Sequence, residues 1–280
     1  IQLVFYFMLL ISCKGGEEAD CPERELQQIQ FDFESELQDW VDLGGSVEMK
    51  NAEEIQITSD TFYSGSTAVK FTVSPDSYVN NGNRAELSFD QQIKEGDVTT
   101  YEYSVLIPAD YQDVNSLKAD DGKTNWQVLG QWHDQPDICK GETWVDLGSN
   151  SPPIAIYYSY LTKEDPEYIK ILSGSEISEV YGADPNWDKV SVLALDYGDK
   201  TIAIYQIEKG TWYRLKFDIK WSQGDDGHVQ VWINDEPFSD GMVSGSNMHN
   251  AASHYFKFGL YRNPTIPYTN SVYYDDVVIY

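Results

Sequence analysis

The chain has 280 residues, enough for one large β domain or two small ones. Its 46 Asp and Glu residues against 19 Lys and Arg residues give a formal net charge of -27, and a hydrophobic fraction of 41% excludes disorder for most of the chain. This acidic excess argues against a nucleic-acid partner and against docking on anionic lipid headgroups, because both need a cationic surface.

The first segment has the pattern of an export signal. Residues 1–12 (IQLVFYFMLLIS) are apolar, too few for a comfortable membrane span, and end directly before Cys13. The order Leu-Ile-Ser-Cys resembles the lipobox of bacterial lipoproteins. We therefore expect 1–12 to be the remainder of a signal peptide, Cys13 to carry a lipid and 13–29 to form a flexible acidic tether; a buried strand or helix is the alternative. The expected location is the outer membrane or cell surface of a Gram-negative bacterium, or its periplasmic face, with the lipid anchor as the only membrane contact.

The three cysteines form no recognisable framework. Their odd number does not complete a set of disulfides, and no CxxC pair suggests a zinc site. Cys21 falls in the tether, and we expect Cys139 to be a free thiol in a loop.

From residue 30 onward, short alternating runs are separated by Gly, Asp, Asn and Pro, as in β proteins. The expected strands include 68–73, 100–107, 154–160, 212–221, 228–233, 255–261 and 272–280. The only modest helix candidate is 168–180, and neither an internal repeat nor a linker divides the body. We predict one all-β domain over 30–280, a jelly-roll sandwich of two antiparallel sheets.

Alternation along these strands separates core side chains from polar faces. In 213–221 the odd-numbered residues are apolar and the even-numbered ones are charged. Three further strands place mainly polar side chains opposite their apolar sets. On the first these are Arg84, Glu86 and Ser88, and on the third they are Tyr255, Lys257, Gly259 and Tyr261. On the second, Gln127, Leu129, Gln131 and His133 share a face, from which Gln131 and His133 project.

Five motifs occur in order along the body. They are NRAELS (83–88), VLGQWHDQPD (128–137), GTWYRLKFDIKWSQGDDGHVQVWIND (210–235), YFKFGLYRNP (255–264) and VYYDDVVIY (272–280). Together they resemble jelly-roll polysaccharide lyases of the glucuronan-lyase and heparin-lyase type, and the R-x-E-L, Q-x-H and Y-F-K-x-G-x-Y patterns are more loosely similar to jelly-roll alginate lyases. The resemblance implies a concanavalin A-like sandwich whose concave face forms a glycan cleft. It departs from the alginate-lyase pattern at Ser88 and Phe89, where that pattern has a second Arg, and at the bulky Trp132.

The resemblance implies a carbon–oxygen lyase that cleaves a uronic-acid-containing polyanionic polysaccharide, glucuronan-like or ulvan-like, by β-elimination. The C5 proton beside the carboxylate is hardly acidic, so hydrogen-bond donors must hold the carboxylate and stabilise an enolate-like transition state. Arg84 suits this as a bidentate cation, and Gln131 can donate from its amide.

The acid and base remain open between two residues. The base is His133 or Tyr261, and Tyr261 matches the family motif for the acid that protonates the departing O4. In a glucuronate unit the C5 proton and O4 lie on the same side, so one tyrosine could serve both steps. An epimerised unit such as iduronate places them on opposite sides and favours His133 as base with Tyr261 as acid.

Further candidates surround this set. Lys257 and Arg262 are candidate contacts to neighbouring carboxylates or sulfates, and Asn83 is a further substrate-binding candidate. Tyr255 is a candidate for stacking on a sugar or hydrogen-bonding to it, with a framework role as the alternative. Catalysis is expected to need no cofactor. The chain is expected to act as a monomer.

Two carboxylates near the ends of the body raise the question of a structural calcium ion. Glu34 and Asp275 would come together if the terminal strands of the jelly roll are adjacent, and oxygen ligands of this kind suit Ca²⁺. The alternative is that both are surface carboxylates or loop caps.

Two other functions compete with the lyase. A glycoside hydrolase needs two carboxylates flanking the scissile bond, and the E-x-D-x-x-E strand motif of one large sandwich hydrolase group is absent. A non-catalytic surface glycan-binding lipoprotein would keep the aromatic residues and Arg84 but would not need His133 together with Tyr261.

Overall fold

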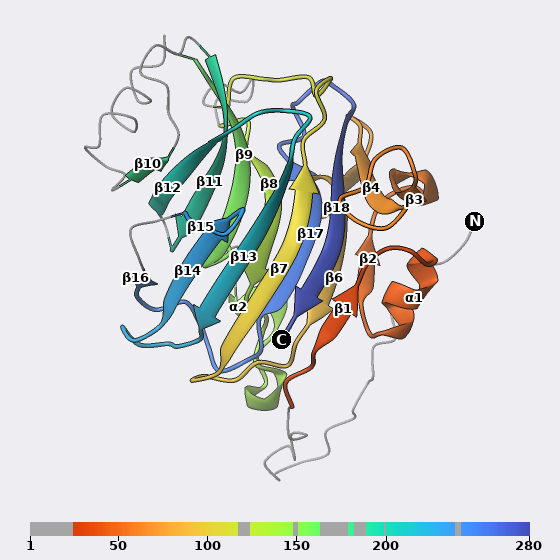
Figure 1. Cartoon of the computed structure of the whole chain (residues 1–280). Helices are drawn as coiled ribbons and strands as arrows, with labels where there is room; N and C mark the ends of the chain where they lie inside the picture. Colours follow the sequence, from red (N-terminus) through yellow and green to blue (C-terminus); the bar gives the residue numbers. More distant parts are fainter. Residues whose placement is uncertain are drawn as a thin grey trace.

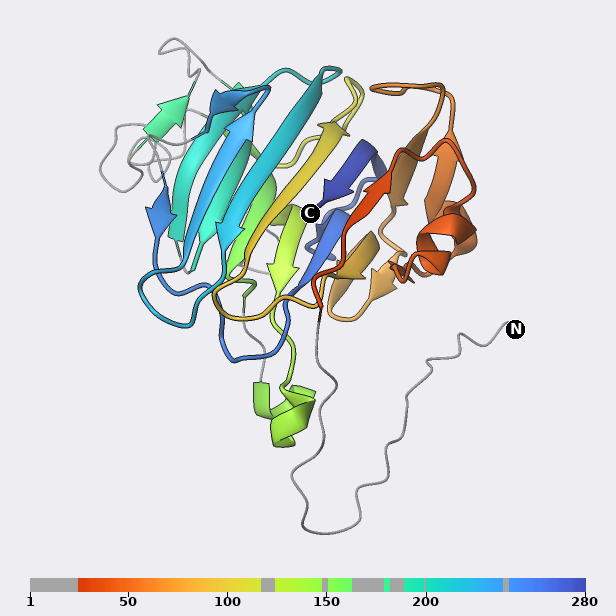
Figure 2. The same cartoon turned by 60° about the horizontal axis from the view of Figure 1, so that its bottom comes forward.

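The computed structural model describes residues 25–116, 124–147, 151–162, 179–181, 189–198, 200–238 and 242–280. Two sheets packed face to face make up the body (Figures 1 and 2). This confirms the predicted jelly-roll sandwich. Among the described strands, all pairs are antiparallel except β10 with β12, which is parallel. No helix in the described part of the chain is long and apolar enough to cross a membrane.

The first sheet contains nine strands among the described residues. In spatial order they are β15 (Glu236–Pro237), β14 (His228–Ile233), β13 (Trp212–Lys220), β7 (Val98–Leu106), β18 (Asn270–Ile279), β4 (Ala68–Val73) and β3 (Ile55–Thr58), with β1 (Ile29–Phe31) paired to β18 and β16 (Val243–Ser244) paired to β14.

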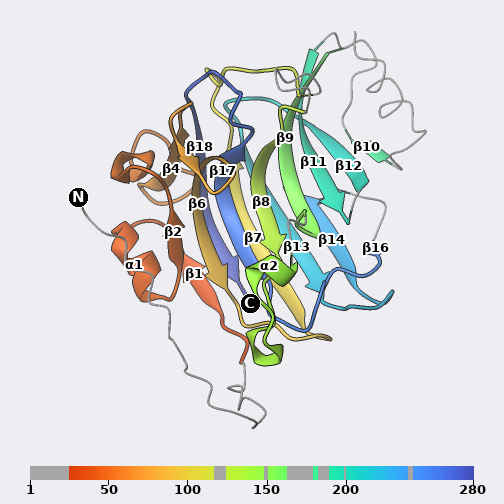
Figure 3. The ribbon, with the colours of Figure 1, turned by 180° about the vertical axis from the view of Figure 1, so that it is seen from behind.

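The second sheet also contains nine described strands, and Figure 3 looks onto it. Their order is β10 (Glu179–Tyr181), β12 (Lys200–Ile207), β11 (Lys189–Tyr197), β9 (Ile154–Thr162), β8 (Gln127–His133), β17 (Tyr255–Arg262), β6 (Gly82–Asp90) and β2 (Ser46–Glu48), with β5 (Tyr78–Val79) paired to β6.

Helices are few and short in the described residues. They are α1 (Leu37–Asp42), α2 (Trp144–Leu147) and two 3₁₀ turns at Ala52–Glu54 and Ile138–Lys140. Of the helix candidate at 168–180, residues 168–178 lie outside the described part of the chain, and residues 179–180 belong to β10.

Alternation decides which side chains form the core. In β13 the residues Tyr213, Leu215, Phe217 and Ile219 are buried, whereas the charged residues between them are half-buried. The aromatic centre of the core joins both sheets: the Trp132 ring lies 4.6 Å from Phe217 and 4.9 Å from Phe256. Burial of such rings is the main favourable term in folding this sandwich.

The alternation expected for β8 is wrong in its first half. Leu129 packs in the core, whereas Val128 lines the open face of the sheet. The pairing of β8 with β9 shifts register between Val128 and Gly130, which marks a β-bulge. The extra residue resets the alternation, so Gln131 and His133 still project from the open face as expected.

Candidate active site

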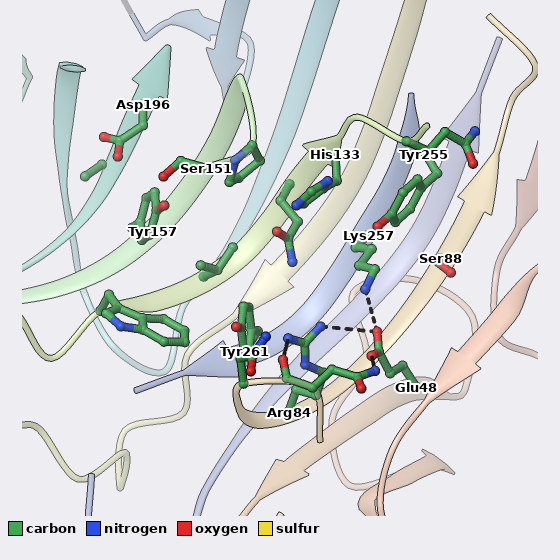
Figure 4. A pocket seen from close by; sticks show the side chains of 18 of the residues that line it. Glu48, Arg84, Ser88, His133, Ser151, Tyr157, Asp196, Tyr255, Lys257 and Tyr261 are labelled. Atoms are coloured by element: carbon green, nitrogen blue, oxygen red, sulfur yellow. Dashed lines mark hydrogen bonds and ion pairs between the residues drawn. The ribbon is translucent and has the colours of Figure 1, made fainter. Parts of the chain in front are cut away.

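A large cleft of about 1290 Å³ covers the open face of the second sheet (Figure 4). Side chains from seven neighbouring strands line it, from β2 at one side to β12 at the other. Its members include the candidates Arg84, Gln131, His133, Tyr255, Lys257 and Tyr261.

Cross-strand register determines which of these side chains are neighbours. On β17, Tyr261 pairs with Arg84 of β6, and Lys257 pairs with Gln131 of β8. Tyr255 pairs with His133. Paired residues of adjacent strands point to the same face of a sheet, so the pairing forms three polar rows across the cleft floor.

The Arg84 guanidinium is already engaged with protein groups. Its Nη1 lies 3.2 Å from Glu48 Oε2 and 3.2 Å from Glu86 Oε2, and its Nε and Nη2 donate to the carbonyl oxygens of Val79 and Asn80. Coulombic attraction from the two carboxylates overcomes the effect of burial and raises the pKa of Arg84. The expected free bidentate fork is therefore not present, because most of the N–H groups are used.

Glu86 lies at the centre of this network and Glu48 at its rim. The buried Glu86 accepts a hydrogen bond of 2.6 Å from Gln131 Nε2, and Lys257 Nζ donates to Glu48 Oε2 at 2.5 Å. Burial opposes ionisation of Glu48, but Lys257 and Arg84 outweigh it and lower its pKa. Both cations are thus neutralised from within the protein, as buried charges must be.

Sequence analysis did not assign either carboxylate to the site. Glu86 alternates with Arg84 in RAELS, so the strand pattern contained the signal for its position. Glu48 lies on a strand of only three residues, and nothing in the local sequence indicated its contact with Arg84.

Tyr261 lies directly against Arg84. The Arg84 Cζ is 3.6 Å from the centroid of the Tyr261 ring, and Trp126 packs edge-on against the same ring with a centroid distance of 4.6 Å. Burial raises the pKa of the Tyr261 phenol, and the Arg84 charge opposes this shift. A cation on the face of the ring lowers the pKa of the phenol relative to that of an equally buried phenol with no cation beside it.

His133 belongs to a different part of the cleft. Its Nδ1 lies 2.8 Å from the backbone oxygen of Asp134 and 3.1 Å from the Asp134 carboxylate, so a proton on Nδ1 leaves Nε2 as the acceptor. Its ring is stacked on Tyr255, with a centroid distance of 5.7 Å. Tyr261 pairs with Val128, five residues from His133 along β8, which corresponds to about 16 Å of strand. The structure therefore places Tyr255, not Tyr261, beside His133.

Asn83 and Arg262 lie outside the cleft, which corrects their expected contact with substrate. Both residues are fully buried and alternate with cleft residues, so their side chains point to the opposite face of the sheet. Arg262 Nη2 donates to the carbonyl oxygens of Val73 and Tyr268, and Asn83 Nδ2 donates to that of Pro75. These are framework roles.

Glu34 and Asp275 meet at one loop but act there as backbone caps. Glu34 accepts hydrogen bonds from Ser66 N at 2.6 Å and Thr67 N at 2.9 Å, and Asp275 accepts from the backbone N–H groups of Tyr63 and Ser64. The Ser66 hydrogen bonds lower the pKa of Glu34 to about 2. Because N–H groups point at these oxygens, the pair does not fit Ca²⁺. The described residues contain no cluster of three or more His, Cys, Asp or Glu side chains that could hold a metal.

Two sequence expectations concern cysteines. Cys139 is disulfide-bonded, so the expectation of a free thiol is wrong. Cys13, the expected lipid attachment site, lies outside the described residues.

Comparisons with solved structures show where this sandwich recurs. The endo-β-1,4-glucuronan lyase of the fungus Trichoderma reesei matches with 17% identity and a TM-score of 0.57, over 92% of this chain and 95% of that chain. Alginate lyase Aly36B, a variant of which was solved with an alginate trisaccharide, matches with 14% identity and a TM-score of 0.54, over 90% and 97%. The catalytic domain of a glycoside hydrolase family 131 protein from Coprinopsis cinerea has 14% identity and a TM-score of 0.50, over 84% and 82%.

At these identities the structural matches establish the fold alone, since the same sandwich supports both lyases and a hydrolase. No curated protein sequence matches significantly. The sequence model of a family described as polysaccharide lyase, however, matches residues 32–278, which is nearly the whole described body. The chain therefore belongs to the polysaccharide lyase family.

Proposed function

We propose that this lyase cleaves a uronate-containing polysaccharide by β-elimination at a glucuronate-configured unit, with Tyr261 as both base and acid. The observation that carries the proposal is the direct contact between Arg84 and Tyr261 on the cleft floor. A group that holds the uronate carboxylate and a group that reaches C5 and O4 must act on the same sugar ring. Arg84 and Tyr261 satisfy this condition, whereas the backbone of His133 lies about 16 Å along the strand direction from that of Tyr261.

The proposed reaction begins with Tyr261 as the phenolate. Its oxygen takes the C5 proton while the electrons of the C5–H bond pass into an enolate-like carboxylate group. The C4–O4 bond then breaks, a C4–C5 double bond forms, and the same phenol returns its proton to O4. Because the C5 proton and O4 of glucuronate lie on one side of the ring, one oxygen serves both transfers.

The carboxylate needs donors that remain unused in the resting network. Gln131 Nε2 has a second N–H beside the one that binds Glu86, and Lys257 Nζ lies in the same row. Arg84 Nη2 has one further N–H beyond its bond to Asn80. Three single donors from neighbouring strands thus replace the bidentate clamp expected from sequence.

A substrate screen tests the proposal. The protein is incubated with glucuronan, ulvan, alginate and heparin while ultraviolet absorbance of the conjugated double bond and new reducing ends are recorded together. We expect both signals to rise with glucuronate-containing polymers. Reducing ends without absorbance would indicate a hydrolase, and neither signal, with retained binding, would indicate a glycan-binding protein.

We also propose that the enzyme works outside the cytoplasm on a lipid anchor at Cys13. The Cys139 disulfide supports an oxidising compartment, and the Leu-Ile-Ser-Cys order supports lipidation. Fatty-acid labelling of the full-length precursor expressed in a Gram-negative host, compared with its Cys13→Ala variant, tests this. Equal labelling of the two proteins would contradict it.

A further inference from the structure

Asp196 lies on the cleft floor, across the sheet from Lys257 (Figure 4). The pairing runs from Lys257 to Gln131, then to Ala155 of β9 and Asp196 of β11. Asp196 is therefore two strand spacings from Gln131, about 10 Å. This places it within reach of a sugar that neighbours a ring held at Gln131.

The Asp196 carboxylate has no cationic partner among the described residues. Its Oδ1 accepts a hydrogen bond of 2.6 Å from Thr201, at a point where the pairing of β11 with β12 shifts register. Burial raises its pKa to about 6, with the Thr201 bond opposing the shift, so the group is mostly ionised at neutral pH. Its remaining oxygen can accept a hydroxyl hydrogen but repels an anion.

Among the described lining residues, no Lys or Arg is free to offset the charge of Asp196. Arg84 and Lys257 are the Lys and Arg residues among the described lining side chains, and Glu48 and Glu86 neutralise both. A polymer with a carboxylate on every ring would place one of them against Asp196 in a partly desolvated site. Like charges juxtaposed in this way weaken binding strongly.

We propose that the cleft is built for a polysaccharide whose uronates are flanked by uncharged sugars, and that Asp196 selects the uncharged ring through hydrogen bonds from its hydroxyls. This inference rests on the proposed function, because it concerns the sugar next to the uronate that is cleaved. It separates the substrate from dense polyuronates, which share the reactive unit but not its neighbours.

A matched pair of substrates is provided by intact glucuronan and by glucuronan in which part of the glucuronate units have been chemically reduced to glucose units. The backbone linkage is the same, and only the charge of the neighbouring rings differs. We expect the wild-type kcat/KM per remaining uronate to be about tenfold higher on the partly reduced polymer. An equal or lower value would overturn the inference.

Asp196→Asn removes the charge and keeps a hydrogen-bonding group of similar size. We expect this variant to reduce the preference to within about twofold, mainly through faster cleavage of intact glucuronan. Asp225→Asn is the control, since it removes the same charge from an exposed turn outside the cleft lining and should retain the wild-type preference. The local role of Asp196 would be contradicted if the Asp196→Asn variant kept the wild-type preference. It would also be contradicted if the Asp225→Asn variant lost that preference.

Calorimetric binding of both polymers to Tyr261→Phe separates this inference from the proposed function. Absence of unsaturated product from every polymer with the wild-type protein would reject the elimination chemistry. The binding preference would still decide the inference: tighter binding of the partly reduced polymer supports it, and tighter binding of intact glucuronan overturns it.

Discussion

The Arg84 side chain shows how a buried charge constrains an active site. A guanidinium that leaves water must be paired, and Glu48 and Glu86 provide the pairing. The sequence pattern predicted that Arg84 would face the cleft, and it does. It could not predict the partners, because Glu48 comes from a strand 36 residues away along the chain.

Tyr261→Phe removes one hydroxyl and keeps the ring against Arg84 and Trp126. We expect turnover to fall by on the order of 10²–10⁴-fold, because the proposed acid and base are lost together, while binding of substrate changes little. Steady-state rates and calorimetric affinities measure the two effects. Tyr255→Phe makes the same change beside His133 and should lower turnover far less. The reverse ranking of the two variants would move the reacting centre to His133.

The pH profile identifies the base by a separate route. Burial raises the pKa of Tyr261, so the phenolate population increases only as pH rises into the alkaline range. We expect kcat/KM on glucuronan to increase through pH 8 and above, about tenfold per pH unit below that pKa. A profile that levels off near neutral pH would instead indicate a histidine base.

At the scale of the element, β6 makes room for Tyr261 with a glycine. A Cβ on Gly82 would lie 2.4 Å from Tyr261 Cε2 and 3.0 Å from the backbone oxygen of Arg262. The backbone of β6 thus fixes how far the phenol can sit toward the cleft floor.

Gly82→Ala is therefore expected to displace the Tyr261 ring. We expect kcat to fall by about tenfold or more with a smaller change in KM, since a misplaced catalytic group slows the chemical step. Gly224→Ala is the control, because its added Cβ would meet ordinary contacts of 3.4 and 3.6 Å. Kinetics and thermal unfolding of both variants distinguish displacement from general destabilisation. Unchanged kcat in Gly82→Ala would mean that the tyrosine is free to adjust.

Strand alternation predicted much of this site and also shows its limit. It placed Arg84, Lys257 and Tyr261 on the open face, and the seven expected strands appear with ends shifted by no more than two residues. Applied consistently, it would also have excluded Asn83 and Arg262, which alternate with cleft residues. It failed at Leu129 because a bulge depends on the partner strand, which local sequence does not specify.

For the whole molecule, the two-layer sandwich was predictable because its evidence is spread over many strands. The contacts between distant segments were not predictable in the same way. The separation of His133 from Tyr261 depends on the register of β8 against β17, and composition carries no information about register.

Acid stability depends on a histidine inside the fold. His254 is fully buried against Trp221, and burial lowers its pKa to about 4, below the ordinary value of 6.5. The unfolded chain therefore binds more protons between pH 6.5 and 4, so the free energy of unfolding decreases as pH falls through this window, by up to about 3 kcal/mol.

His254→Phe should reduce that pH dependence, because no imidazole remains to be protonated on unfolding. Urea unfolding at pH 7 and pH 4.5 measures it, with His228→Gln on β14 as a control that removes a partly exposed histidine. Identical pH dependence in wild type and His254→Phe would assign acid sensitivity to other groups.

The breadth of the cleft has a consequence for the products. Seven adjacent strands contribute to it, and their six spacings cover about 29 Å, more than one sugar ring can occupy. Long polymers can therefore lie across the whole floor, whereas fragments shorter than the floor lose contacts and dissociate. We expect exhaustive digestion to stop at short oligosaccharides rather than to proceed to single sugars.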